Sequence, residues 1–374
     1  MNKLKELWSE KKKLIIFISG CVLLVLILLI ILIFILANAF KRYDSHEIEN
    51  MMITATKKYL SAHQDVYPTP NNPISTIEVS TLVEKEYLKE LSKISKDSQC
   101  DGTIQIVYEK EEQSSPIYRY IPYLKCEHYE TTSLLEVIQN KEMIQENQEG
   151  LNKLGDTYLY KGESVNNYLE YLNYSWRIFK FDKDRIYLVL SDTLNDKAYV
   201  FDDRYNEMAK SNRGKNTFEN SRIYDTLNGF YDSFFAGHHA YLKNMDACTH
   251  TRSKYDTQKD GSIECFTTTS TPISLLTIYD YMNASLDPYC IRVEDRNCSN
   301  YNYLSNTSNH FWLLNGTNED TYHVYYVNSS MNGAIQLYAA NQKTYIRVVI
   351  ALPSDVIFKS GVGTKDNPYT IYEF

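Results

Sequence analysis

The longest apolar segment of the chain, residues 14–40, contains no charged side chain. A helix that crosses the roughly 30 Å of bilayer hydrocarbon needs about 20 apolar residues. This run is longer, whereas a secretory signal peptide has an apolar core of only about 7–15 residues. A buried helix of a soluble protein would also keep a polar face. The sequence therefore predicts one transmembrane helix at residues 14–40, embedded in the lipid bilayer.

Charges are distributed unevenly around this segment. Residues 1–13 contain five lysines and two glutamates, and three of these lysines directly precede the apolar run. Because positive charges favour the cytoplasmic side, we expect a cytoplasmic N-terminus at residues 1–13 and extracellular C-terminal domains, in a single-pass protein of the cell membrane. The whole chain has a net charge of −8, so the exported part is acidic. Nucleic acid is therefore excluded as a partner, since it requires a basic surface.

All cysteines except Cys21 follow the apolar run. An even number of cysteines in an exported region predicts disulfides, although their connectivity stays open. Pairing between sequence neighbours is the simplest arrangement. It joins Cys100 to Cys126, Cys248 to Cys265, and Cys290 to Cys298.

Histidines close to Cys248 offer an alternative, a zinc site that also includes His250, His238 and His239. Neither C-x-x-C nor H-x-x-x-H spacing occurs in the chain, and zinc sites usually show such spacing. His238 and His239 are also candidate bases of a cell-envelope hydrolase. The G-x-S-x-G nucleophile motif is absent from the sequence. We therefore expect no catalytic residues, no metal and no cofactor.

Asp256, Gln258, Asp260 and Gly261 match part of a calcium-binding loop. A complete loop of the EF-hand type ends in a bidentate glutamate, and Thr267 occupies that position here. The simpler interpretation is a turn at the Asp-Gly pair. It lies between two of the cysteines that we expect to be paired.

The exported part is predicted to be α+β. In residues 41–130, Ile48, Met52, Ala55 and Tyr59 recur at helical spacing, and we expect this helix to continue the membrane helix. The further elements expected there are a strand at 75–80, a helix at 82–91 that begins with a capping box of Thr81 and Glu84, and strands at 102–110 and 116–126.

The following segment, residues 131–153, begins with a second capping box, Ser133 with Glu136. Its Glu, Gln and Asn content predicts a solvated helical connector that extends to Gly150. From residue 154 the chain becomes richer in Tyr, Asn, Ser and Thr, and we expect a disulfide-braced α+β head domain at 154–374. Its expected elements are a hairpin around 182–184, helices at 218–235 and 271–285, a hairpin that turns at Asn332-Gly333, and a strand at 345–353.

The first half of the chain resembles the pilin-like or pseudopilin exported domains of low-GC Gram-positive bacteria. The resemblance rests on the outward-running membrane helix, on TLVEKEYL at 81–88, and on Cys100-Asp-Gly with YIPYLKCEHYET at 120–131. It implies a small α+β stalk at residues 41–130. Pilin precursors carry Gly-Phe and then Glu in the apolar run, whereas here Gly20 precedes Cys21 and no Glu occurs in residues 14–40. The resemblance therefore does not extend to filament assembly.

The second half resembles an uncharacterised bacterial surface-domain family over most of residues 154–374. The matching segments include NYSWRIFKF, SRIYDTLNGFYDSFF, HVYYVNSSMNGAIQ and YIRVVIALPSDVIFKSG. FWLLNG and RVVIAL are also faintly similar to C-type lectin-like folds, which is a likeness of fold and transfers no site. The family implies a surface location and no particular activity.

Tyrosine is abundant, with 33 residues in the chain. Tyr with Asn and Ser supplies rigid amphipathic contact surface, although AT-rich codon usage also favours this composition. Large aromatics such as Trp176 and Trp312 more often lie in a core. The predicted function is a non-catalytic binding or adhesion module for an extracellular protein or glycan, and the alternatives are a structural subunit of a pilus-like or envelope assembly and a hydrolase. The expected contact residues are Trp312, Asn315, Tyr322, Tyr325 and Tyr326.

Overall fold

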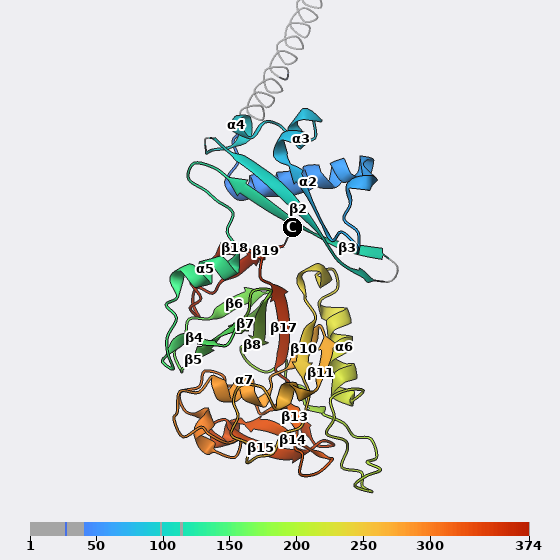
Figure 1. Cartoon of the computed structure of the whole chain (residues 1–374), viewed down its shortest axis with the longest axis vertical. Helices are drawn as coiled ribbons and strands as arrows, with labels where there is room; N and C mark the ends of the chain where they lie inside the picture. Colours follow the sequence, from blue (N-terminus) through green and yellow to red (C-terminus); the bar gives the residue numbers. More distant parts are fainter. Residues whose placement is uncertain (1–26, 28–40, 98, 113–114, 374) are drawn as a thin grey trace, which may run out of the picture. The chain divides into compact units, whose positions relative to one another are not determined.

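The computed structural model describes residues 27, 41–97, 99–112 and 115–373 (Figure 1). The predicted membrane segment lies outside these residues except for Ile27, so the transmembrane helix stays a prediction. None of the helices in the described part of the chain is long and apolar enough to cross a bilayer. The described residues form a mixed α+β fold, as the sequence predicts, and strands predominate in it.

Helices and strands alternate irregularly along the chain. The α-helices are α2 (Ser45–Ala62), α3 (Val79–Glu84), α4 (Leu91–Ile94), α5 (Leu134–Lys141), α6 (Arg222–Phe234) and α7 (Ile278–Asn283). The longer strands are β1 (Ile74–Glu78), β2 (Asp101–Glu112), β3 (Ser115–Lys125), β4 (Gly150–Leu154), β5 (Thr157–Lys161), β6 (Tyr168–Tyr171), β7 (Tyr174–Phe181), β8 (Arg185–Leu190), β10 (Met245–Cys248), β11 (Thr268–Thr271), β12 (Ile273–Leu275), β13 (Phe311–Gly316), β14 (His323–Asn328), β15 (Ala334–Ala339), β17 (Val348–Pro353), β18 (Ile357–Ser360) and β19 (Thr370–Tyr372). The short elements include β9 (Tyr199–Val200), β16 (Lys343–Thr344), η4 (Arg296–Ser299) and η5 (Ser329–Met331).

The described residues belong to two compact units. The first holds residues 41–67, 75–105 and 122–130, and the second holds residues 68–74, 106–121 and 131–373. The second unit contains the larger hydrophobic core.

In the first unit, α2 begins at its own N-terminal cap. The Asp44 carboxylate accepts a hydrogen bond from the Glu47 amide at 2.8 Å, and the Glu47 carboxylate accepts one from the Asp44 amide at 3.0 Å. This reciprocal pair is a capping box. Tyr43, just before it, forms a β-bridge with Ser95. The expected continuation of the membrane helix into α2 is therefore wrong.

The helix expected at residues 82–91 is also misplaced. α3 starts at Val79, so Thr81 lies inside the helix and does not cap it. The helix ends at Glu84 because Glu86 takes a positive φ of 62°, which an α-helix does not accommodate. A separate short helix, α4, follows at Leu91.

The predicted connector helix is shorter than expected. Ser133 caps α5 by accepting a hydrogen bond from the Glu136 amide at 3.2 Å, but the helix ends at Lys141. The chain then pairs with β4, because the Gln145 amide donates to the Leu151 carbonyl at 2.7 Å. Leu134 of α5 is fully buried in the core of the second unit. This helix therefore packs into that core, and a solvated connector is the wrong description of it.

Seven strands of the second unit form one sheet, in the order β12-β17-β8-β7-β5-β4, with β6 also paired to β7. β7 and β8 confirm the hairpin predicted around residues 182–184 and are antiparallel. β17 confirms the predicted apolar strand and lies between β8 and β12. All residues of β17 are buried, which explains why its sequence is continuously apolar.

The helix expected at residues 271–285 begins only at Ile278. The preceding residues form β12, in which Ile273 pairs with Ile350 of β17. A short apolar run is compatible with either a strand or a helix. Here residues 273–275 form a strand because they pair with β17. Thr277 caps α7 by accepting a hydrogen bond from the Asp280 amide at 3.1 Å. By contrast, α6 agrees with the helix predicted at 218–235 and is capped by Ser221.

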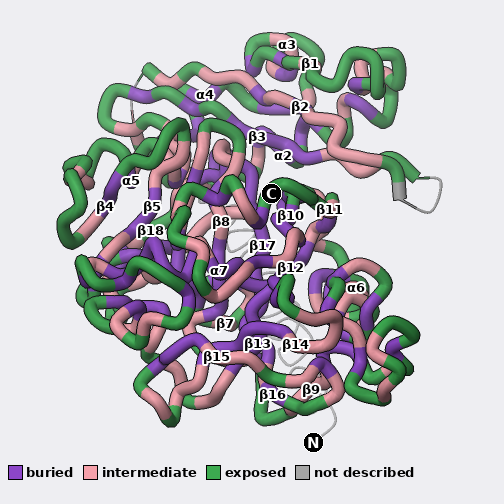
Figure 2. The backbone as a smooth tube through the Cα atoms, turned by 60° about the horizontal axis from the view of Figure 1, so that its bottom comes forward, coloured by how far each residue is buried: buried purple, intermediate pink, exposed green. Residues whose placement is uncertain are grey.

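A second sheet of three strands, β13-β14-β15, belongs to the same unit. β14 and β15 confirm the second predicted hairpin, with Asn332 and Gly333 at positive φ in the turn. In Figure 2 the buried parts of the backbone follow β7, β17, β13 and β14, whereas the exposed parts lie mainly in loops. Residues of both sheets contribute to one hydrophobic core.

The three predicted disulfides are confirmed. Cys100 is bonded to Cys126, Cys248 to Cys265, and Cys290 to Cys298. The bonds therefore join sequence neighbours, and none of these six thiols is available to a metal.

Candidate functional site

The contact residues predicted from the sequence are mostly inside the protein. Trp312 and Asn315 are 0% exposed, Tyr325 is 1% and Tyr326 is 9% exposed. Tyr322 is half-buried. A buried side chain cannot meet an extracellular partner, so the contact role predicted for Trp312, Asn315, Tyr325 and Tyr326 is wrong. For the half-buried Tyr322 it stays a prediction.

These residues have structural roles. The indole nitrogen of Trp312 donates to the Tyr199 carbonyl at 2.9 Å. The Asn315 amide donates to the Cys248 carbonyl at 2.8 Å, and its oxygen accepts from the amide of Ile278 at 3.1 Å. Asn315 thus joins β13 to the ends of β10 and α7, and a polar side chain in this position is explained by the need to satisfy buried backbone groups.

The tyrosines on β14 and just before it also make structural hydrogen bonds. The Tyr325 hydroxyl donates to the Arg252 carbonyl at 3.1 Å, and the Tyr326 hydroxyl donates to the Gln336 side chain at 3.0 Å. Tyr322 accepts a hydrogen bond from Arg213 at 2.9 Å. Both faces of β13 and most residues of β14 are buried. The abundance of aromatic residues in the sequence does not reveal this burial.

The segment that matched part of a calcium loop is occupied by an arginine. Arg252 lies fully buried inside this loop and donates to the carbonyls of Asp256 at 3.0 Å and Gln258 at 2.6 Å. The Asp260 carboxylate accepts from the amide of Ser262 at 3.0 Å, as in an Asp-Gly turn. The guanidinium of Arg252 thus binds the carbonyls that a calcium ion would need in this loop. The interpretation as a turn at the Asp-Gly pair therefore fits.

His238 and His239 lie close together but have different partners. The His238 ring and the Glu373 carboxylate are joined at 2.5 Å, and Tyr171 donates to the other oxygen of this carboxylate at 2.5 Å. His239 stacks on Tyr231, with 4.3 Å between ring centroids. Because Cys248 is in a disulfide, the zinc site suggested by the sequence does not form from these residues.

One group of possible metal ligands occurs among the described residues, in the first unit. It consists of Asp97, Glu127 and His128. The His128 ring and the Asp97 carboxylate are 3.0 Å apart, and the pKa of His128 is raised mainly by this hydrogen bond. The histidine is exposed, and exposed groups of this kind are common surface ion pairs.

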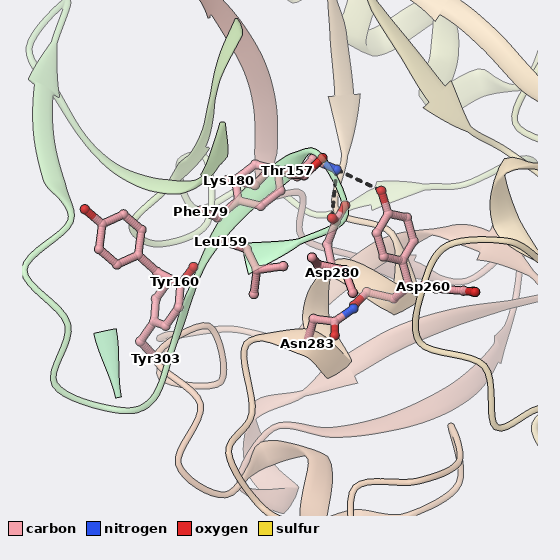
Figure 3. Close-up of a pocket in the computed structure, with 11 residues that line it drawn as sticks. Thr157, Leu159, Tyr160, Phe179, Lys180, Asp260, Asp280, Asn283 and Tyr303 are labelled. Atoms are coloured by element: carbon pink, nitrogen blue, oxygen red, sulfur yellow. Dashed lines mark hydrogen bonds and ion pairs between the residues drawn. The ribbon is translucent and has the colours of Figure 1, made fainter. Parts of the chain in front are cut away.

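A small pocket in the second unit is built around a buried ion pair. The Lys180 ammonium donates to the Asp280 carboxylate at 2.8 Å and to the Tyr279 hydroxyl at 2.9 Å. Figure 3 shows Lys180 and Asp280 pointing toward each other at the wall of this pocket. Its volume is about 90 Å³, which is room for a few waters. Thr277 donates to the second oxygen of Asp280 at 2.6 Å.

The electrostatics of this pocket favour a structural role. Burial alone lowers the pKa of Lys180, but the charge of Asp280 and the Tyr279 hydroxyl outweigh burial, so the pKa lies above its ordinary value. A lysine that stays protonated has no lone pair and cannot act as a nucleophile. The pair instead links β7 to α7.

A larger, open cleft lies elsewhere in the second unit, near η4 and the turn of the β14–β15 hairpin. Its volume is about 620 Å³, within the roughly 300–1,000 Å³ that small-ligand sites occupy. Amide, hydroxyl and carboxylate side chains dominate its lining, and none of the described residues that line it is a lysine or arginine. The residues that line it include Asp287, Asn300, Tyr301, Asn306, Ser329 and Asn332.

Tyr301 has an unusual conformation in this cleft. Its φ is 46°, a left-handed value that bulky residues rarely take. The residue is nevertheless 60% exposed, so burial does not compensate for the strain. Backbone strain of this kind costs on the order of 1–3 kcal/mol and is concentrated at functional sites.

Neighbouring groups hold Tyr301 in place. The buried Asn302 side chain donates to the carbonyls of Tyr281 at 2.9 Å and Cys298 at 2.8 Å. The amide of Leu286 donates to the Tyr301 carbonyl at 3.2 Å, and Cys298 is tied to Cys290 by a disulfide. The aromatic ring is therefore presented from a rigid loop.

Sequence reasoning missed this cleft. Tyr301 is one of many tyrosines, and neither its exposure nor its backbone angle can be read from spacing. The only available signal was the expected loop between Cys290 and Cys298, which ends just before it.

The chain matches no protein-family model, no curated protein and no solved structure.

Proposed function

We propose that this chain is a membrane-anchored, exported binding protein whose C-terminal unit recognises an extracellular partner through the cleft around Tyr301. Residues 14–40 are the proposed anchor, and the pilin-like and surface-domain resemblances are part of the same proposal. The exposed, strained Tyr301 at the cleft is the observation that carries it.

The disulfides support export. Six cysteines form three bonds, and disulfides persist mainly in oxidising, exported environments. This agrees with the lysines that precede the apolar run and favour a cytoplasmic N-terminus.

The cleft supports binding. It combines one exposed aromatic ring with several amides and hydroxyls, which is the residue mixture of adaptable contact surfaces. The side chain of Asn302 and the Cys290–Cys298 disulfide hold the loop before binding occurs, which reduces the entropy lost on association.

The location is tested by a thiol count and by protease accessibility. We expect one reactive thiol, Cys21, in the denatured and unreduced full-length chain. In intact Gram-positive host cells, added protease should remove residues beyond 41 and leave a tag at the N-terminus intact. More than one thiol, or a protected C-terminal part, would contradict the proposed export.

Binding is tested with the full-length chain in lipid nanodiscs on arrays of purified extracellular-matrix proteins and oligosaccharides. We expect saturable binding to at least one component, and we expect Tyr301→Asn to weaken it by about tenfold or more. Asparagine tolerates the left-handed conformation, so this variant removes the ring without adding strain. Tyr289→Asn is the matched control, because Tyr289 is 70% exposed and does not line the cleft. Absence of saturable binding on both arrays would overturn the proposal.

A further inference from the structure

The chemistry of the cleft narrows the class of ligand. We propose that the cleft binds a neutral oligosaccharide, with a sugar ring stacked on Tyr301 and its hydroxyls bound by Asn300, Asn306 and Asn332. This inference rests on the proposed function, since it names the ligand of the same site.

The exposed ring supplies the stacking face. An aromatic face is electron-rich, and the C–H groups on one face of a pyranose ring carry a small positive charge that it attracts. Among the described residues, no side-chain partner occupies the Tyr301 hydroxyl, and 60% of the residue is open to solvent. A flat, amphipathic ligand therefore fits this ring better than a compact ion does.

The amides supply the hydrogen bonds. Each asparagine side chain offers two N–H donors beside one carbonyl acceptor, a pattern that matches neighbouring hydroxyls, since each hydroxyl both donates and accepts. Asn306 and Asn332 are exposed at the cleft. Asn300 uses one N–H on Asp287 at 2.7 Å, which leaves its carbonyl oxygen for a ligand hydroxyl.

The charges exclude acidic ligands. Glu163 and Asp287 line the cleft without a lysine or arginine among its described lining residues. The hydrogen bond from Asn300 is the main cause that lowers the pKa of Asp287, so this carboxylate stays ionised at neutral pH. A phosphate, sulfate or sialic acid would meet like charge without a partner, which is unfavourable.

The volume and open form of the cleft fit an extended oligosaccharide. The cleft of about 620 Å³ is open and half of its lining residues are exposed, in contrast to the smaller pocket at Lys180. Binding of several sugar units along a surface, with modest affinity, is the expected mode.

The experiment is calorimetric titration of the full-length chain in nanodiscs with cellotetraose, maltotetraose and chitotetraose, with 3′-sialyllactose as the anionic comparison. At least one neutral tetrasaccharide should bind saturably and more tightly than sialyllactose. Tyr301→Asn should weaken this binding by about tenfold or more, because the stacking face is lost. Tyr301→Phe, which keeps the ring, should stay within about threefold of the wild type, and Tyr289→Asn should bind as the wild type does.

Three results would overturn the inference: no saturable binding of any neutral tetrasaccharide, equal binding by Tyr301→Asn, or tighter binding of sialyllactose. Failure of this inference is distinguishable from failure of the proposed function. Tyr301-dependent binding to a matrix protein alone would refute the oligosaccharide and leave the proposed function standing. No binding to any component would refute both.

Discussion

Arg252 and Glu264 form an ion pair in which both side chains are 0% exposed, with 2.6 Å between the guanidinium nitrogen and the carboxylate oxygen. Arg252 also holds the carbonyls of Asp256 and Gln258. The pair therefore organises the whole loop that the Cys248–Cys265 disulfide closes.

Removal of Arg252 should destabilise the second unit strongly. We expect Arg252→Ala to lower the free energy of unfolding by about 3–5 kcal/mol, because it leaves the Glu264 carboxylate buried without its partner. Chemical unfolding followed by tryptophan fluorescence measures this. Arg292→Ala is the control, since Arg292 is 45% exposed in its ion pairs and should cost no more than about 1 kcal/mol. If both variants lost the same free energy of unfolding, the burial of the Arg252–Glu264 pair would not explain the effect of Arg252→Ala.

The Cys248–Cys265 disulfide should stabilise the same loop. The two cysteines are 17 residues apart, and in the chain-entropy model a loop of about this length is worth about 3 kcal/mol. We therefore expect the double variant Cys248→Ala/Cys265→Ala to lower the free energy of unfolding by about this amount. Cys21→Ala should have no effect, because the six described cysteines pair among themselves. An unchanged midpoint in the double variant would count against this expectation.

Stability should fall in acid partly because of Glu219. Burial raises the pKa of this carboxyl, but hydrogen bonds from Thr249 and Thr269 outweigh burial and leave the pKa below its ordinary value of 4.5. A carboxyl with a lowered pKa in the folded state stabilises the protein above its unfolded pKa, and this stabilisation is lost as the pH falls through the folded pKa.

The test compares the wild type with Glu219→Gln in urea titrations between about pH 5 and pH 3. We expect the free energy of unfolding to fall less steeply in the variant, because its side chain cannot take up a proton. Glu207→Gln, at an exposed glutamate, should keep the slope of the wild type. Parallel curves for the wild type and Glu219→Gln would show that Glu219 contributes nothing.

Two glycines should respond oppositely to alanine. Gly214 has a φ of +86°, and an added Cβ would lie 1.8 Å from the Asp202 carbonyl oxygen. We expect Gly214→Ala to lower the free energy of unfolding by more than about 1 kcal/mol. Gly229, on the exposed side of α6, has nothing within 4 Å of an added Cβ. Gly229→Ala should therefore stabilise the protein by about 0.5–1 kcal/mol, as thermal unfolding would show. A stable Gly214→Ala variant would contradict the close packing at this turn.

The local elements were largely predictable from the chain itself. The β7–β8 hairpin and β17 follow from apolar runs with turn residues between them, and α6 follows from helical spacing after Ser221. The disulfides follow from pairing neighbours, because short loops close at the smallest entropic cost. Composition and charge also determined the expectation of an anchored, acidic, exported protein.

Other features depended on contacts between distant residues. Whether Ile273 belongs to a helix or a strand is decided by its pairing with Ile350, and α5 becomes part of a core only because Leu134 meets other buried residues. The functional assignment of the aromatics depended on the same contacts. Trp312 and Tyr325 are buried and donate hydrogen bonds to Tyr199 and Arg252, which are far away in sequence. Tyr301, by contrast, is left exposed by a strained turn that Asn302 holds. Residue type and spacing determine which side chains the sequence offers for binding. Their burial and backbone angles arise only when the sheets and loops pack together. Burial and backbone angle therefore decide which tyrosine can contact a ligand.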